Sequence, residues 1–430
     1  MDNRKTIRLE SSWFGEMIKR LKPKSEFSRN VLTLMTGTTI AQAIPIAISP
    51  ILTRIYTPEE FGLFALYVAI ASILAVIATG RYELAIMLPK KEEDAFQITL
   101  LASLITVTIS FIILVIMLIF NTQIARLLQN PEIGPWLYLI PLSVLITGLY
   151  QSLNYWHNRN KRYTNIATNR VIQSGGTAIS QLGFGLWFQS IGLIVGQLIG
   201  QILALGYFLK TYFKNDRQQT FKEMKMRALA KRYSQFPKID VPTAMTNITA
   251  NQAPNILLAT LFSASSAGFY YLTQRVLQAP ITLISSSVLD VFKQRASEDY
   301  KKHGHCKEIF KKTFWALLLM ALPPSLILYF WVEDLFSFVF GEPWREAGVY
   351  AQILIPALFL RFIANPLSFM IYIAEKQVWN FLCMAGLLLM ILAGLLTSND
   401  AVEAVRIISI SYCLYYLLHL MLSFKLAVTK

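Results

Sequence analysis

Charged residues are scarce in this sequence. Asp, Glu, Lys and Arg make up 15% of its 430 residues, whereas 54% of the residues are hydrophobic. Soluble domains carry about 25% charged residues. The composition therefore excludes an ordinary soluble protein and favours a chain that lies in lipid.

Cysteine and the common catalytic motifs are also nearly absent. Cys306, Cys383 and Cys413 have no paired spacing, which argues against a disulfide framework and a metal site. The sequence contains no Walker loop, no HExxH and no CxxC, and its four histidines are scattered. His303 and His305 are neighbours without a second cluster of ligands. We therefore expect no metal, no cofactor and no enzymatic chemistry.

Long apolar stretches fill most of the chain. A bilayer core about 30 Å thick needs about 20 apolar residues for each spanning helix. Twelve stretches of this kind are present, so we expect an all-α membrane protein. The predicted spans are Asn30–Leu52, Phe61–Gly80, Ala95–Phe120, Pro135–Trp156, Ala167–Phe188, Ile191–Leu209, Val241–Phe262, Ala267–Leu289, Thr313–Val332, Ala347–Ile373, Val378–Leu396 and Ile407–Phe424.

The distribution of positive charge predicts the topology. If the chain starts inside, the cytoplasmic segments hold 33 of the 40 Lys and Arg residues, and the outer segments hold four. The positive-inside rule then places both termini in the cytoplasm. The net charge of +15 is therefore topological, and we expect no nucleic-acid partner. The basic run from Lys222 to Arg232 is expected to face anionic lipid headgroups, with a binding partner as the alternative.

The predicted spans divide into two sets of six. We expect a basic N-terminal segment (1–29), a first bundle (30–209), a basic cytoplasmic linker (210–236) and a second bundle (237–430). In the first segment Leu9, Trp13, Met17 and Leu21 recur at helical spacing, which predicts a helix on the membrane surface. A disordered basic tail is the alternative.

A weak internal repeat relates the two bundles. LTRIYTPEEFGLF from Leu52 aligns with LATLFSASSAGFY from Leu258, and the same register aligns Glu92 and Glu93 with Glu298 and Asp299 in loops after each second helix. Because each half has an even number of spans, the repeat should be parallel, with a pseudo-two-fold axis along the membrane normal.

Three arginines are the only charged residues within the predicted spans. Arg170 lies near a cytoplasmic end, whereas Arg275 and Arg361 lie near the middle of their spans. Arginine at that depth costs about 2.5 to 3.5 kcal/mol on insertion scales and usually faces a cavity. Because no span contains a carboxylate, we expect these arginines to bind an anion such as a diphosphate. Capping of a neighbouring helix is the alternative.

The first span of each half is polar and contains proline. Thr39 and Gln42 precede Pro45 and Pro50 in the first span. In the seventh span Asn247, Asn251 and Asn255 lie on one helical face beside Pro254. Broken polar helices at corresponding positions of two halves are typical of a central transport site. Hydrogen bonding between helices is the alternative.

Several stretches resemble a known family. FSRNVLTLMTGTTIAQAIPIAISPILTRIYTPEEFGLFALY, GRYELAIMLPKKEEDAF and the segment from FPKIDVPTAM to RASEDY are similar to the bacterial polysaccharide-biosynthesis flippases of the multidrug, oligosaccharidyl-lipid and polysaccharide (MOP) exporter superfamily. The resemblance covers nearly the whole chain and is loose after about Ile373. It includes Arg81 and Glu83 in GRYELA and Arg275 in TQRVLQAP, whereas Arg361 in LFLRFIANPLS matches less securely.

The resemblance implies two six-helix, MATE-like bundles around a cationic cavity in the bacterial inner membrane. The implied function is to flip undecaprenyl-diphosphate-linked oligosaccharides to the periplasmic leaflet for O-antigen, capsule or exopolysaccharide synthesis. Arg275, Arg361, Arg170 and Arg81 would engage the diphosphate. Membrane lipids, a polysaccharide polymerase and a chain-length regulator are the other implied partners.

Two other functions, each of a different class, are alternatives to a flippase. A drug or cation exporter of the same superfamily would need a carboxylate within the membrane, and none lies in the predicted spans. A membrane enzyme that polymerises or ligates glycans would need large outer loops, whereas the outer loops predicted here are short.

Overall fold

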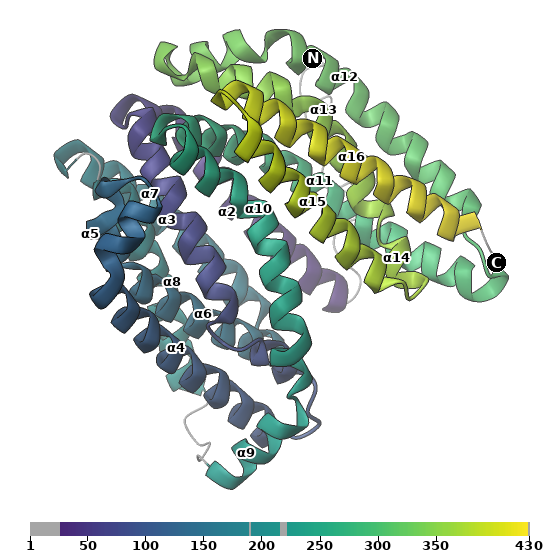
Figure 1. Ribbon diagram of the computed structural model, residues 1–430. Coiled ribbons are helices and arrows are strands. Elements are labelled where there is room, and N and C mark those ends of the chain that lie inside the picture. The colour runs from purple at the N-terminus through teal and green to yellow at the C-terminus, as the bar shows by residue number, and fades with distance from the viewer. Residues whose placement is uncertain (1–25, 189–190, 216–221, 429–430) are drawn as a thin grey trace, which may run out of the picture.

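The computed structural model describes residues 26–188, 191–215 and 222–428, which form helices joined by short turns (Figure 1). The expected surface helix around Trp13 lies outside the described residues. Short elements occur between long helices: η1 (Tyr82–Met87), η2 (Pro131–Ile133), α5 (Gly134–Leu137), α9 (Glu223–Arg232), η3 (Phe236–Asp240), η4 (Glu342–Trp344) and α14 (Met370–Ile373). The long helices are α2 (Glu26–Ile55), α3 (Pro58–Ile77), α4 (Glu92–Leu127), α6 (Ile140–Arg159), α7 (Tyr163–Phe188), α8 (Ile191–Asn215), α10 (Val241–Leu261), α11 (Ala264–His303), α12 (Lys307–Phe340), α13 (Arg345–Leu367), α15 (Gln377–Thr397) and α16 (Ala401–Val428).

Each predicted span coincides with one of these long helices, so the protein is an all-helical, multi-pass membrane protein. Among the described residues, nine helices are long and apolar enough to cross a membrane, and α5 with α6 forms a tenth candidate bent by 48°. The two long helices that fall outside this set are α7 and α10, which are rich in polar and small residues. A count of twelve spans therefore stays a prediction.

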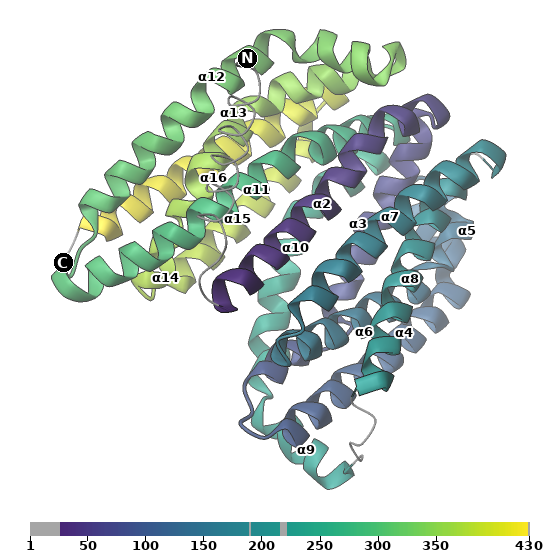
Figure 2. The same cartoon turned by 180° about the vertical axis from the view of Figure 1, so that it is seen from behind.

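The helices of the two halves pack in the same pattern. In the first half the main pairs are α2–α7, α3–α6, α4–α6, α6–α8 and α7–α8. In the second half the helices at corresponding positions pair as α10–α15, α11–α13, α12–α13, α13–α16 and α15–α16. Figure 1 and, from behind, Figure 2 show the two halves side by side, the first beginning with the purple helix α2 and the second running from teal α10 to yellow α16.

The halves contact each other where α3 and α11 begin. A Cβ atom at Gly62 would lie 1.7 Å from the carbonyl oxygen of Ala264, and one at Gly268 would lie 2.0 Å from that of Pro58. Ser265 donates a hydrogen bond to Glu59, and these two residues are 206 positions apart. Gly62 and Gly268, like Pro58 and Ala264, are separated by the same offset. The contacts are therefore reciprocal, as they are in a two-fold interface.

A buried tryptophan strengthens this contact between the halves. Trp344, in η4 of the second half, is 1% exposed, and its Nε1 donates to the carbonyl oxygen of Thr53 at 3.0 Å. Its ring packs edge-on against Phe61 of α3 at 4.9 Å and Phe269 of α11 at 5.9 Å between centroids. We call this contact, with the α3–α11 crossing, the outer seal, because the topology predicts that it lies at the periplasmic ends of the helices.

The segment expected to be a basic loop contains a docked helix. Leu229 of α9 is buried against the first half, and Tyr82 donates to the carbonyl oxygen of Ala230 at 3.0 Å. Lys225 pairs with Glu93 at 2.8 Å and with Asp94 at 2.7 Å. These two carboxylates raise the pKa of Lys225. Lys222 also pairs with Glu93. These two lysines therefore bind carboxylates of the protein, whereas the sequence predicted that they face lipid headgroups.

Two further expectations are corrected by the helix boundaries. Glu298 and Asp299 lie within α11, which continues to His303, whereas the repeat placed them in a loop. The proline-containing helices α2 and α10 run without a break through Pro45 and Pro254. In α2 the Ser49 hydroxyl donates to the carbonyl oxygen of Pro45 at 2.6 Å.

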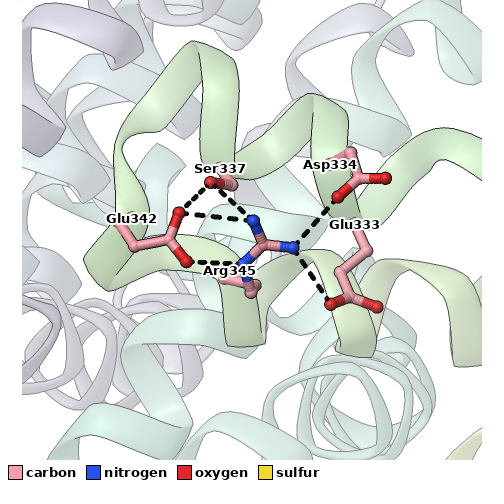
Figure 3. Close-up of polar contacts among 5 residues, drawn as sticks. All are labelled: Glu333, Asp334, Ser337, Glu342 and Arg345. Atoms are coloured by element: carbon pink, nitrogen blue, oxygen red, sulfur yellow. Dashed lines mark hydrogen bonds and ion pairs between the residues drawn. The ribbon is translucent and has the colours of Figure 1, made fainter.

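Arg345 organises the turn between α12 and α13 (Figure 3). Its guanidinium lies within 2.6 Å of Glu342, 3.0 Å of Asp334 and 3.3 Å of Glu333. These groups are largely exposed, so water screens the ion pairs and their main effect is to hold the geometry of the turn.

Candidate substrate site between the two halves

Polar side chains become exposed along one part of α2 and α10. In α10, Asn247 is exposed, Asn251 is partly buried and Asn255 is 3% exposed. In α2, Thr39 is exposed, whereas Thr53, near the outer seal, is buried. Exposure therefore increases away from the outer seal. Polar side chains are costly in lipid, so we interpret this gradient as an opening between the halves toward the predicted cytoplasmic side.

The asparagines of α10 bond within their own helix. The Asn251 amide donates to both the carbonyl and the side-chain oxygen of Asn247 at 2.8 Å. The Asn255 amide donates to Gln252 at 2.9 Å, and its side-chain oxygen is buried without a partner. Hydrogen bonding between helices was the alternative role for this polar face. Within the described residues, these three side chains form no such bond to another helix.

Arg275 of α11 reaches from the second half to α2 of the first. Its Nη2 donates to the carbonyl oxygen of Pro45 at 3.1 Å, while its Nε is buried without a hydrogen-bond partner. One turn before Pro45, the side-chain oxygen of Gln42 is also buried without a partner. The helix-capping contact is thus present, but it uses only part of the guanidinium, and unsatisfied polar groups remain on α2 and α11.

Arg170 contacts the same helix from within the first half. It extends from α7 and donates to the hydroxyl of Thr38 on α2. Thr38 in turn donates to the carbonyl oxygen of Leu34 at 2.7 Å. The structure therefore brings Arg170 and Arg275, from different halves, onto one polar helix.

Arg361 lies apart from this pair. It lines a small cavity of about 20 Å³ whose walls come from α11, α13 and α16, all in the second half. The other polar lining residues are Tyr270, Thr273, Gln274, Gln278, Tyr412 and Tyr416. Arg361 forms no hydrogen bond or ion pair with any residue in the described ranges.

Arg81 lies in the turn after α3 and pairs with an acidic neighbour. Its guanidinium is 3.3 Å from Glu83, whose side chain is almost completely buried. Burial raises the pKa of Glu83, and the hydrogen bond from Thr79 and the charge of Arg81 counteract part of that rise. The left-handed backbone of Arg81, with φ of 61°, fixes this turn. The structure thus gives Arg81 an internal partner in the first half.

The sequence did not predict the residues that hold the two halves together or those that surround Arg361. Trp344 carried no visible signal, because its partners are distant in sequence. Gln274 and Gln278, and likewise Tyr412 and Tyr416, repeat at four-residue spacing. That spacing predicts one helical face and could have indicated a polar cavity.

Comparisons with known proteins agree with this fold. Residues 51–349 match the family model described as "Polysaccharide biosynthesis protein". The succinoglycan biosynthesis transport protein ExoT of Rhizobium meliloti (strain 1021) is 24% identical over 308 residues, which cover 69% of this chain and 59% of that protein. The chain therefore matches less than two thirds of that relative's length.

Two solved structures share the fold at low identity. The lipid II flippase MurJ, in an inward closed conformation, has a TM-score of 0.74 at 14% identity and covers 92% of this chain and 87% of its own. An inward-facing multidrug resistance MATE family transporter of the MOP superfamily has a TM-score of 0.66 at 11% identity. This match covers 90% of this chain and 93% of the transporter. These two likenesses show the fold, and the family match, which spans most of the chain, shows that the protein belongs to the polysaccharide biosynthesis proteins.

Proposed function

We propose that the protein is a flippase of the bacterial inner membrane. Its substrate would be an undecaprenyl-diphosphate-linked oligosaccharide, moved from the cytoplasmic to the periplasmic leaflet for O-antigen, capsule or exopolysaccharide synthesis. The observation that carries the proposal is the convergence of Arg170 and Arg275 on α2. Their acceptors on α2, Thr38 and Pro45, are two helical turns or about 10 Å apart along the helix. Each guanidinium presents several donors to phosphate oxygens.

Alternating access accounts for the asymmetry of the molecule. The outer seal joins the halves at one end, whereas Thr39 and Asn247 are exposed toward the other. We assign this arrangement to an inward-facing state in which the oligosaccharide enters between α2 and α10. The likeness to inward conformations of two related folds supports the assignment.

Reciprocal contacts at the outer seal support a parallel repeat. Because α3 and α11 both begin at this contact, a two-fold axis between them would run along their mean direction, the membrane normal. We propose twelve spans with both termini in the cytoplasm, divided at the 210–236 linker. Rocking of the halves would then open the outer seal while the cytoplasmic side closes, and the reverse.

The polyprenyl tail needs an apolar surface near the diphosphate. An apolar groove of about 220 Å³ lies between α11, α12 and α13 and includes Leu277, Pro280 and Ile281. Leu277 is two residues from Arg275 and therefore points about 200° around α11, so this groove would take the tail on the face of α11 opposite the guanidinium. Within this proposal a polysaccharide polymerase and a chain-length regulator would act on the exported unit.

Deletion of the gene tests the proposal directly. Lipid-linked repeat units should then accumulate in the inner leaflet, measured by the protection of their glycans from a periplasmic glycosidase in spheroplasts. Complementation with the wild-type gene should restore both glycan access and surface polysaccharide. Normal access of the glycans to the enzyme in the deletion strain would contradict a flippase role.

A further inference from the structure

The small cavity around Arg361 is chemically distinct from the site at α2. Its lining residues come from α11, α13 and α16, whereas Arg275 points from α11 to α2. Gln274 and Arg275 are consecutive on α11, and successive helical residues point about 100° apart. One helix thus presents polar groups to two separate places.

Hydrogen-bond donors surround this cavity, and no carboxylate lines it. Arg361 supplies a permanent positive charge. Tyr270 is completely buried, and its hydroxyl has no hydrogen-bond partner. Tyr412, Tyr416, Gln274 and Gln278 can also donate. Arg361 is partly buried, and no acidic residue in the described ranges pairs with its guanidinium.

The size of the cavity limits what can bind. About 20 Å³ accommodates roughly one water-sized particle. A diphosphate is many times larger, so it does not fit this cavity as it stands, whereas a monatomic anion is close to the available size.

We propose that Arg361 and the surrounding hydroxyl and amide groups bind a small inorganic anion, of the halide class, inside the second half. The anion neutralises the guanidinium and holds α11, α13 and α16 together. Because α11 also carries Arg275, occupancy of this cavity is coupled to the position of the substrate-facing arginine.

Halide-dependent thermal unfolding of the purified full-length protein tests the proposal. Sodium bromide replaces sodium gluconate at constant ionic strength, and binding to the folded state raises Tm with a saturable dependence on bromide. Arg361→Gln should remove this rise. Arg275→Gln, a matched change on the substrate-facing side of α11, should keep it.

Milder variants keep the test informative if Arg361→Gln fails to fold. Arg361→Lys should retain a weaker bromide response, and Tyr412→Phe, which removes one donor, should weaken the apparent affinity about 2- to 10-fold. The proposal is overturned if the wild-type protein shows no saturable response. It is also overturned if Arg361→Gln folds and responds to bromide like the wild type. If Arg361→Gln does not fold, the proposal is overturned when Arg361→Lys and Tyr412→Phe both respond like the wild type.

A pyrophosphate arm separates this site from the diphosphate site. If pyrophosphate raises Tm through Arg361 more strongly than bromide does, Arg361 belongs to the substrate site and the small-anion proposal is wrong. Bromide binding is measured without transport, so its failure leaves the flippase proposal intact, and a failed export test leaves the anion site intact.

Discussion

Arg275 joins the two halves through one side chain. One of its nitrogens bonds to the Pro45 carbonyl oxygen, and another is buried without a partner. A contact that only capped α2 would leave no reason to bury an unsatisfied donor, which costs about 1 to 3 kcal/mol. We therefore interpret the Pro45 contact as a resting position from which the guanidinium can turn to a phosphate.

Substitution of Arg275 should separate charge from geometry. Arg275→Gln should reduce surface polysaccharide at least about tenfold, because a lost charge-assisted contact costs about 1.5 to 3 kcal/mol. Arg275→Lys should restore part of it, since it keeps the charge without the planar fork. The measurement is surface glycan normalised to the amount of protein in the membrane.

Arg126→Gln is the control for this prediction, because Arg126 is an exposed arginine in the last turn of α4. It should export normally. Normal export by Arg275→Gln would favour helix capping as the role of Arg275.

The sequence revealed these arginines because a charge inside an apolar run is visible without a structure. Their partners were not visible. The contact of Arg275 is a backbone carbonyl 230 residues away, which depends on how two helices pack. For the same reason the sequence grouped Arg361 with Arg275, although their side chains lie in different surroundings.

At the scale of helices, the crossing of α3 and α11 depends on two glycines. Gly268→Ala should force the backbones apart, because the added methyl group would lie 2.0 Å from the Pro58 carbonyl oxygen. Overpacking of this kind costs about 1 to 3 kcal/mol. We expect a lower Tm in the purified protein, and Gly62→Ala should act in the same direction.

Gly206→Ala in α8 provides the matched control, since a Cβ atom there meets nothing within 4 Å. It should leave Tm unchanged or raise it, because alanine favours a helix over glycine. A Tm for Gly268→Ala equal to that of Gly206→Ala would show that the crossing is looser than the contacts indicate.

Helix positions were predictable because long apolar runs have few alternatives in a membrane. The helix ends were less predictable, since charged residues can continue a helix beyond the bilayer, as they do in α11 up to His303. The docking of α9 was missed because its partners, Glu93 and Asp94, are about 130 residues away.

For the whole molecule, the proposed motion requires the outer seal to open. Cysteines at Glu59 and Ser265, in a background without the native cysteines, should be cross-linked by a short bifunctional thiol reagent, because these side chains are in contact. Cross-linking should arrest export, measured as surface polysaccharide, and a cleavable reagent should allow reduction to restore it.

A cysteine pair at Ser337 and Glu342 is the control, since these side chains also touch but belong to one half. Cross-linking this pair should leave export unchanged. Export that continues with Glu59 and Ser265 fully cross-linked would mean that the substrate does not leave between the outer ends of α3 and α11.

The polarity of α7 has a consequence for how the chain enters the bilayer. This helix is not apolar enough to count among the candidate spans, yet Gln181 within it donates to the carbonyl oxygen of Leu193 in α8 at 3.1 Å. Gly196 and Gly200 of α8 also lie close to the backbone of α7. A polar side chain whose hydrogen-bond partner lies on a neighbouring helix favours transfer of both helices together from the translocon into lipid. During biogenesis α7 should therefore wait at the lateral gate until α8 has been synthesised, and the two should enter lipid as a hairpin.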